Sequence, residues 1–314
     1  MATKLIRGLY NFKPNNQGVV ATIGNFDGVH LGHQALITEI KQKAKNLGLK
    51  SLVITFEPQP LEFFLGNKSV PRLTRFREKF LFLADSGVDH VLVLSFNQAL
   101  AGISANDFIE DLLVNKLKVK HLVVGEDFHF GKSREGDINF LHNAAAKLPD
   151  FSVKTKDNVI IGGERVSSTR IRQELVAGKH ALAETLLGKP YSMMGRIVHG
   201  NKLGRTLGIP TANIHLHRKN SAVSGIYTVI THGISKEPLN GVANVGIRPT
   251  IGGTRSLLEV HLLDFNDDIY GKYVTVEFCE KLRDEEKYPT LDALKTQMLK
   301  DVDSAREYFE KIKI

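Results

Sequence analysis

Two histidines and three glycines lie within ten residues near the N-terminus, in the stretch Gly-Asn-Phe-Asp-Gly-Val-His-Leu-Gly-His at 24–33. His30 and His33 are three residues apart, so they share one face of a helix that begins there. Glycine lets a backbone approach a phosphate closely, and the unpaired N–H groups of a helix N-terminus attract negative charge. Paired imidazoles at such a place can donate hydrogen bonds to a phosphate whose charge grows in a transition state. The stretch therefore predicts a phosphate-binding turn.

Two other interpretations of this turn remain open. His-x-x-His is also the spacing of a metal-binding pair, although no third ligand follows close in the sequence. The histidines could also be incidental to a tight turn, but the density of glycines and the flanking elements argue against that interpretation.

A second polar loop, Gly-Glu-Asp-Phe-His-Phe-Gly-Lys-Ser at 125–133, looks at first like a P-loop. A P-loop has four residues between its first glycine and the Gly-Lys pair, whereas this loop has five. Phe128 and Phe130, with Glu126 and Asp127 before them, suit a planar heterocycle better than a triphosphate.

A third motif, Ser-Ser-Thr-Arg-Ile-Arg at 167–172, opens a predicted short helix. Its hydroxyls can cap that helix, with Glu174 in reach to help. Capping alone does not account for Arg170 and Arg172, because cations are disfavoured at a helix start unless an anion is bound there. The motif therefore predicts a second phosphate contact.

The elements that carry these motifs change character halfway along the chain. In the first half, strands alternate with helices, which predicts a parallel sheet with helices on both faces and ligands beyond the carboxyl ends of its strands. The predicted strands are 19–23, 51–56, 91–95 and 121–124, and the predicted helices are 33–47, 76–85, 105–114 and 138–147.

After a short helix at 178–187 and the breaker Gly188-Lys189-Pro190, short strand-like runs follow with few helices between them, which predicts a β-barrel or sandwich. These runs are 195–198, 226–231, 241–245, 257–263 and 273–278. A last helix, 290–312, has an apolar stripe that suits packing: Leu291, Leu294, Met298, Val302, Ala305 and Phe309. We expect two domains, 1–186 and 187–314.

Composition excludes several classes of protein. The chain has 314 residues, 42% of them apolar, which suits a globular protein with a real core. No run approaches the ~18 apolar residues of a membrane helix, and the N-terminus lacks the apolar core of a signal peptide. The single cysteine, Cys279, excludes an internal disulfide. These features predict a cytoplasmic protein with no membrane partner.

The net charge of +8 is spread over the chain. Residues 1–187 hold 24 basic and 19 acidic side chains, a balance of +5, and the remainder hold 18 and 15, a balance of +3. This distribution argues against a nucleic-acid-binding arm and fits two sites for anionic ligands, although a surface tuned for solubility would explain it equally well.

The first and third motifs together resemble the nucleotidylyltransferase superfamily, which transfers AMP or CMP to a phosphate acceptor. The longer match over 22–33, with Glu57-Pro58 and the aromatic loop, resembles the FMN adenylyltransferase module of bacterial FAD synthetases. The resemblance implies flavin contacts at Asp127 and Phe128. It implies that catalysis and nucleotide binding depend on Gly24, Phe26, Asp27, Gly28, His30, His33, Ser168, Thr169 and Arg172, with His30, His33 and Arg172 catalytic.

The second half resembles the riboflavin kinase module, a small β-barrel. The resemblance rests on Gly-Arg-x-Leu-Gly-Ile-Pro-Thr-Ala-Asn at 204–213, Asn-Val-Gly-x-Arg-Pro-Thr at 244–250 and Glu-x-His-Leu-Leu-Asp-Phe at 259–265. It implies Mg²⁺ on Thr211 and Asn213, which offer the hard oxygen ligands that Mg²⁺ prefers. It also implies nucleotide contacts at Gly204 and Thr211, a flavin contact at Arg248, and Glu259 as catalytic base.

The two resemblances together imply an enzyme that phosphorylates riboflavin to FMN and then joins FMN to AMP, with ATP as co-substrate in both steps. A nucleotidylyltransferase with another acceptor is one alternative, which the second half of the chain disfavours. A flavin-binding or regulatory protein without catalysis is another, which the retained His30, His33 and Glu259 disfavour. The sequence does not predict an oligomeric state.

Overall fold

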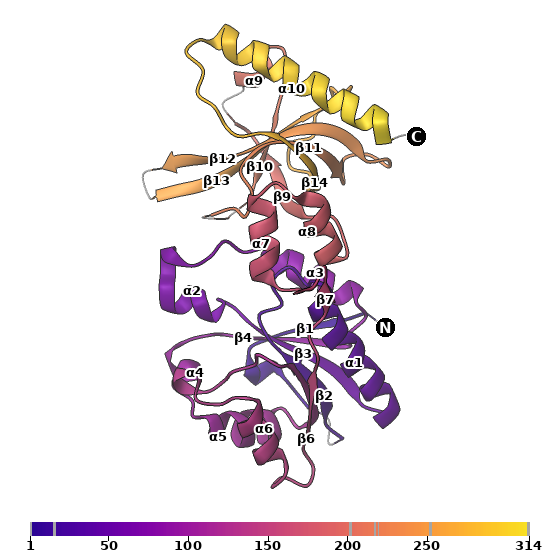
Figure 1. Cartoon of the computed structure of the whole chain (residues 1–314), viewed down its shortest axis with the longest axis vertical. Coiled ribbons are helices and arrows are strands. Elements are labelled where there is room, and N and C mark those ends of the chain that lie inside the picture. Colours follow the sequence, from indigo (N-terminus) through magenta and orange to yellow (C-terminus); the bar gives the residue numbers. More distant parts are fainter. Residues whose placement is uncertain are drawn as a thin grey trace. The chain divides into compact units, whose positions relative to one another are not determined.

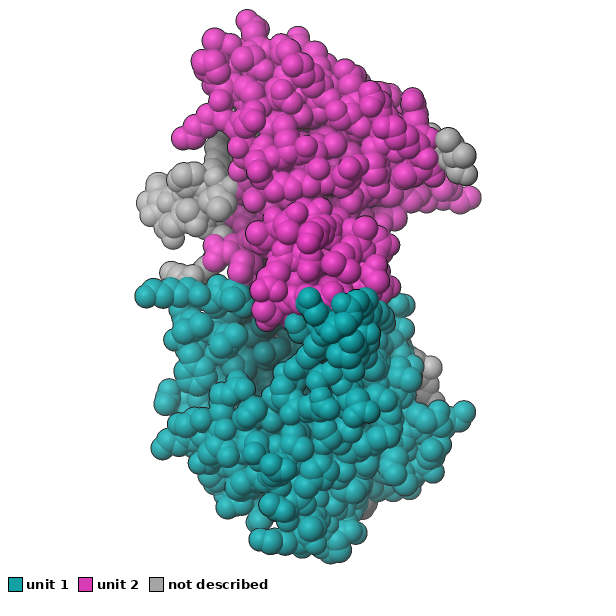
Figure 2. All heavy atoms as spheres, in the orientation of Figure 1, with its two compact units in different colours: residues 1–70, 76–167 teal, residues 71–75, 168–314 magenta. Residues whose placement is uncertain are grey.

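The computed structural model describes residues 2–14, 17–200, 203–216, 218, 220–250 and 253–312. They form two compact units (Figure 2): one comprises Met1–Val70 and Phe76–Ser167, and the other comprises Pro71–Arg75 and Ser168–Ile314. Within the described ranges, no helix is long and apolar enough to cross a membrane. The domain boundary expected after residue 186 stays a prediction.

The first unit is built on a wholly parallel six-stranded sheet (Figure 1). The order of its strands is β1-β4-β3-β2-β5-β6. Its strands are β1 (Lys4–Arg7), β2 (Val19–Ile23), β3 (Lys50–Phe56), β4 (His90–Leu94), β5 (Val119–Gly125) and β6 (Ser152–Lys156). The strand order reverses between β2 and β5, and ligands of such sheets bind beyond the carboxyl ends at a reversal of this kind. The turn after β2 and the loop after β5 therefore begin side by side.

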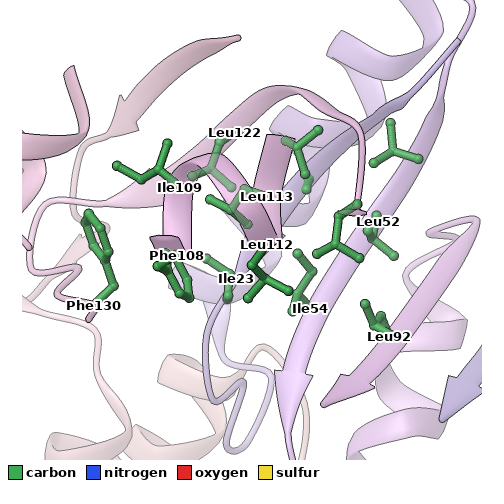
Figure 3. Packing of buried hydrophobic residues seen from close by; sticks show 14 of the residues in the cluster. Ile23, Leu52, Ile54, Leu92, Phe108, Ile109, Leu112, Leu113, Leu122 and Phe130 are labelled. Carbon is green, nitrogen blue, oxygen red and sulfur yellow. The ribbon is translucent and has the colours of Figure 1, made fainter. Parts of the chain in front are cut away.

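Alternate residues of these strands fill two cores, one on each face of the sheet. Figure 3 shows the first core, where Ile23, Leu52 and Leu122 of the strands pack with Phe108 and Leu112. The second core contains the intervening strand residues and the apolar faces of two helices, with Val20, Val53, Val91, Val123, Ile37, Ile40, Ala44 and Leu83. Burial on both faces explains why the central strands read as continuous apolar runs.

The helices of this unit confirm the predicted alternation, with one difference. The α-helices are α1 (Leu31–Leu47), α2 (Pro60–Leu65), α3 (Phe76–Asp85), α4 (Gln98–Ala101), α5 (Ala105–Asp107) and α6 (Ile138–Ala145), and η3 (Phe108–Lys116) is a π-helix. The helix expected over 105–114 is thus a single α-turn that continues as a π-helix. The remaining elements are the 3₁₀ helices η1 (Leu9–Asn11), η2 (Gly66–Lys68) and η4 (Lys132–Arg134) and the hairpin of β7 (Ile160–Ile161) and β8 (Glu164–Arg165).

The second unit is built on a closed antiparallel barrel with the order β10-β13-β12-β11-β14-β9, which confirms the barrel predicted from the sequence. The barrel closes because β9 pairs with both β10 and β14. Its strands are β9 (Ser192–Val198), β10 (Ala212–His215), β11 (Gly225–His232), β12 (Leu239–Thr250), β13 (Gly253–Leu262) and β14 (Tyr273–Arg283). Its helices are α7 (Ser168–Val176), α8 (His180–Leu187), α9 (Leu203–Thr206) and the terminal α10 (Leu291–Ile312).

Five residues from the first half of the chain, 71–75, belong to this second unit. Arg172 of α7 donates from Nε to the carbonyl oxygen of Pro71 at 2.6 Å. Arg218 donates from its guanidinium to the carbonyl oxygens of Arg72 and Leu73, at 3.1 and 3.4 Å. Two arginine side chains therefore anchor this segment.

The apolar stripe of α10 has two roles. Val302, Ala305 and Phe309 pack in a core cluster with barrel residues, whereas Leu294 and Met298 line a cavity. The expectation that the stripe serves packing holds for its C-terminal half.

An ion pair between the buried Asp301 and the half-buried Arg283 interrupts the stripe. The carboxylate of Asp301 accepts hydrogen bonds from Arg283 Nε at 2.8 Å and from a terminal guanidinium nitrogen at 2.7 Å, and a third from Gln297 at 3.0 Å. The hydrogen bonds to Asp301 raise the pKa of Arg283. A second bidentate pair, Arg306 with Asp264, ties the same helix to the barrel at 2.6 and 2.8 Å but lies at the surface.

These two pairs allow a matched test of burial. We expect Asp301→Asn to lower the free energy of unfolding of the barrel unit by about 2 kcal/mol, because it leaves the half-buried guanidinium of Arg283 without its bidentate carboxylate partner. Asp264→Asn should cost less than about 1 kcal/mol, because water replaces the exposed partner. Urea unfolding followed by circular dichroism measures both, and equal losses in the two variants would contradict the assignment.

Candidate functional sites

The turn between β2 and α1 depends on backbone conformations that few residues adopt. Phe26, Gly28 and Val29 have φ angles of +49°, +83° and +46°. Phe26 and Val29 are almost fully buried, so their packing in the core compensates for the strain of their conformation. The bends bring His30 to the N-cap of α1.

The two histidine rings contact each other. His30 Nδ1 accepts a hydrogen bond from the backbone N–H of His33 at 3.4 Å, and the two rings stack with centroids 3.6 Å apart and planes 18° apart. A Cβ atom at Gly32 would lie 3.2 Å from the His30 ring, so glycine leaves room for it. Because Nδ1 accepts, the proton of the neutral ring resides on Nε2, which can donate to a phosphate oxygen.

The two phenylalanines of the aromatic loop after β5 differ in burial: Phe130 is buried and Phe128 is half-buried. Phe130 is buried against Phe108, with ring centroids 5.0 Å apart, and exchanges two backbone hydrogen bonds of 3.0 Å with Gly136. Phe128 is half-buried and stacks on Phe130 at 5.5 Å. The Asp127 carboxylate pairs with Arg165 at 2.7 Å. Phe128 therefore offers an aromatic face, while Phe130 holds the loop in place.

A second aromatic group, which the sequence analysis missed, follows β3 and β4 at the same edge of the sheet. Phe96 makes edge contacts with Phe56, Phe63 and Phe64 at ring distances of 5.5 to 5.8 Å. Phe64 is 63% exposed, which is unusual for so large an apolar side chain. The positions of Phe56 and Phe96, at or just beyond the ends of predicted strands, could have indicated this aromatic group from the sequence.

Ser168, Thr169 and Arg172 all lie on α7, in the second compact unit. Thr169 is exposed and Arg172 is half-buried, with its Nε bonded to Pro71. The structure thus describes the two parts of the predicted phosphate site in separate units, and their joint action on one ligand stays a prediction.

One row of directly paired residues crosses the barrel. Asn213 of β10 pairs with Glu259 of β13, which pairs with Asn244 of β12. Asn244 pairs with Ile226 of β11, and Ile226 pairs with Arg283 of β14. Directly paired residues face the same side of a sheet. All five line one cavity of about 300 Å³, so the row forms a wall that is polar at one end, apolar in the middle and ion-paired at the other.

Apolar side chains complete this first cavity, which includes Leu207, Ile209, Leu257, Leu294, Met298 and Val302. A second cavity, of about 320 Å³, is more polar, and its lining includes Arg205, Pro210, Thr211, Asp267, Asp268 and Tyr270. Thr211 lines both cavities. On β13 the first cavity takes Glu259 and His261 and the second takes Val260 and Leu262, so the two cavities lie on opposite faces of this strand.

The turn that carries Thr211 is closely packed. A Cβ atom at Gly204 would clash with the carbonyl oxygen of Ile209 and come within 3.3 Å of Thr211 Oγ1. His261, a residue that the sequence analysis did not assign, bonds through Nδ1 to the carbonyl oxygen of Pro210 at 2.8 Å. The turn is therefore fixed from two sides.

Among the described residues, no group of three or more His, Cys, Asp and Glu side chains could hold a metal ion. Thr211 and Asn213 offer a hydroxyl and an amide oxygen on one cavity wall, and oxygen donors of this kind suit Mg²⁺. Arg248 belongs to β12, but its side chain lies outside the described part of the chain, so its predicted flavin contact stays a prediction.

Comparison with known proteins identifies one family for each half of the chain. The FAD synthetase family matches residues 12–170, and the riboflavin kinase family matches residues 187–309. The bifunctional riboflavin kinase/FMN adenylyltransferase of Escherichia coli (strain K12) is 48% identical over 98% of both chains. The protein of the same name from Haemophilus influenzae is 49% identical over 98% of this chain and 99% of its own.

Among solved structures, a Streptococcus pneumoniae protein described as a macrolide-efflux protein has the same fold. It superposes with a TM-score of 0.81 at 30% identity, over 98% of this chain and 99% of its own. Its name describes that protein only. Since two families match consecutive parts of this chain and relatives match it from end to end, the chain belongs to the bifunctional riboflavin kinase/FMN adenylyltransferase family.

Proposed function

We propose that this enzyme makes FAD in two ATP-dependent steps, one in each half of the chain. The C-terminal half phosphorylates riboflavin to FMN, and the N-terminal half transfers AMP from ATP to FMN with release of pyrophosphate. The observation that carries this proposal is the match of both families to consecutive parts of one chain. A cytoplasmic location forms part of the proposal, because both steps consume ATP.

In the kinase step, riboflavin occupies the cavity that contains Glu259, and ATP occupies the cavity lined by Arg205 and Tyr270. The apolar lining of the first cavity suits a flat flavin ring, and Thr211 lines both cavities. Glu259 removes the proton of the terminal ribityl hydroxyl as its oxygen attacks the γ-phosphorus of ATP. The bond from that phosphorus to the bridging oxygen breaks, and ADP leaves.

Thr211 and Asn213 are the side chains that would hold Mg²⁺ in this site, since both supply oxygen ligands beside the proposed base. The ion, when bound, would offset charge on the ATP phosphates. Gly204 allows close packing of the turn, and the His261 contact to Pro210 keeps Thr211 in position.

In the adenylyl transfer step, the phosphate of FMN is itself the nucleophile and needs no strong base. It attacks the α-phosphorus of ATP, and the bond to pyrophosphate breaks. The Nε2–H of His30 and the N-terminus of α1 stabilise the growing charge on the phosphates, with Arg172 as a further donor. Phe128 and the exposed Phe64 offer faces for the flavin ring at the carboxyl edge of the sheet.

The direct test is to incubate the purified chain with riboflavin, ATP and Mg²⁺ and to separate the flavins by chromatography. We expect FMN first and then FAD. FMN without FAD would point to another acceptor for the N-terminal half, and the absence of both would favour a flavin-binding protein without catalysis.

We expect Glu259→Gln to lower kcat for FMN formation by at least about a hundredfold, because the amide cannot accept the hydroxyl proton. The variant keeps the shape of the side chain, and conversion of added FMN to FAD should remain at the wild-type rate. Steady-state assays of each step measure both effects. Equal loss of the two activities would show that the substitution acts on the whole chain and not on one site.

The histidine pair should show the opposite pattern. His30→Asn keeps a good helix cap but removes the Nε2 donor, and His33→Gln removes the second ring. We expect the double variant to lower FMN adenylylation by about a hundredfold or more, with riboflavin phosphorylation intact. His142→Ala, on the exposed side of α6, is the matched control. Adenylylation that survives in the double variant would exclude the histidines from the reaction.

A further inference from the structure

We propose that Asn244 binds the ribityl chain of riboflavin, with its amide oxygen accepting a hydrogen bond from a hydroxyl next to the one that is phosphorylated. The inference rests on the proposed kinase function and adds a substrate-binding residue to it. It assigns to Asn244 the role of distinguishing a flavin that carries a polyol chain from a flavin that lacks one.

The position of Asn244 follows from strand register. It is directly paired with Glu259, on the side opposite Asn213, and all three line the first cavity. Neighbouring strands are about 4.8 Å apart, and paired side chains on one face lie at a similar distance. A substrate whose reacting hydroxyl lies at Glu259 therefore has its next hydroxyls within reach of Asn244.

The side-chain amide of Asn244 contains a hydrogen-bond acceptor that has no donor in the described part of the chain. Its Oδ1 is buried and has no hydrogen-bond partner among the described residues. A buried acceptor left unpaired destabilises a protein, and such atoms call for an explanation when they occur at a cavity wall. This oxygen is shielded in the structure, so the amide turns about its χ2 bond when a ligand binds. A ligand hydroxyl then supplies the missing donor, whereas a phosphate or a carboxylate has no proton to give.

The order of residues along the row separates the ribityl chain from the rest of the substrates. On the Asn213 side, the row leads toward Thr211, which also lines the second cavity, and the proposed function assigns that cavity to ATP. On the other side Asn244 is followed by Ile226, whose apolar surface suits the flavin ring. Only the polyol chain lies between the reacting hydroxyl and the ring, so it is the part of riboflavin that passes Asn244.

The charged and titratable groups around this cavity also suit an uncharged chain of hydroxyls. Beside Glu259 and the Arg283–Asp301 pair, the lining includes His261, Glu285, Glu286 and Tyr288. Carboxylates at these positions would repel an anionic ligand group, whereas riboflavin is neutral.

The test compares riboflavin with lumiflavin, which has the same ring but a methyl group in place of the ribityl chain. Asn244→Leu keeps the size of the side chain and removes its polar atoms. In the presence of ADP and Mg²⁺, flavin fluorescence titrations should show riboflavin affinity about tenfold weaker in this variant, and lumiflavin affinity within about twofold of wild type.

Asn240→Leu is the matched control, because Asn240 lies four residues earlier on the same strand and does not line the cavity. It should change neither affinity. In steady-state assays, Asn244→Leu should raise KM for riboflavin with KM for ATP unchanged, and FMN adenylylation should be as in wild type. Asn244→Ala gives the same comparison if leucine perturbs the barrel.

Equal weakening of riboflavin and lumiflavin in Asn244→Leu and Asn244→Ala would overturn the proposal, because the side chain would then act on the ring or on the fold. Unchanged riboflavin affinity in both variants would overturn it as well. A wild-type chain that forms no FMN would instead contradict the proposed function, so the two failures are distinguishable.

Discussion

The register of the barrel strands decides which side chains meet in the second unit. A shift of β13 by one residue would turn Glu259 to the opposite face and bring neither Asn213 nor Asn244 beside it. The barrel is closed, so β13 is paired on both sides and cannot slip without breaking two ladders. The geometry of the proposed base is thus fixed by backbone hydrogen bonds, and side chains such as His261 refine it.

In the first unit, the order of the strands decides which loops lie next to each other. The reversal between β2 and β5 places the histidine turn beside the aromatic loop, although about a hundred residues separate them in the sequence. The turn itself needs positive φ angles at Phe26 and Val29, which are costly for side chains of this kind. Their full burial stabilises the conformation, so the core of the unit supports the position of the His30 ring.

The sequence predicts a strand or helix correctly where the residue pattern of that one segment is enough to define it. The run 19–23 and the helix 76–85 have the predicted bounds, since burial on both faces and helical periodicity are visible in a single segment. The strands β1 and β6 were missed because they are edge strands, short or rich in polar residues. Asn244 and the Phe56–Phe96 contact were missed because each depends on which strands are neighbours, and no local pattern encodes that.

Charge gives the two sites opposite preferences. The first barrel cavity has four carboxylates in its lining, Glu259, Glu285, Glu286 and Asp301, and its arginine, Arg283, is paired with one of them. Such a cavity favours neutral riboflavin over FMN, whose phosphate is anionic. The turn at the N-terminus of α1 instead presents the positive end of a helix dipole and two imidazoles, which suit an anion. Under the proposed function, the phosphate that the first step adds is disfavoured in the barrel cavity and favoured at this turn. The order of the two reactions itself follows from their chemistry, because that phosphate is the nucleophile of the second step.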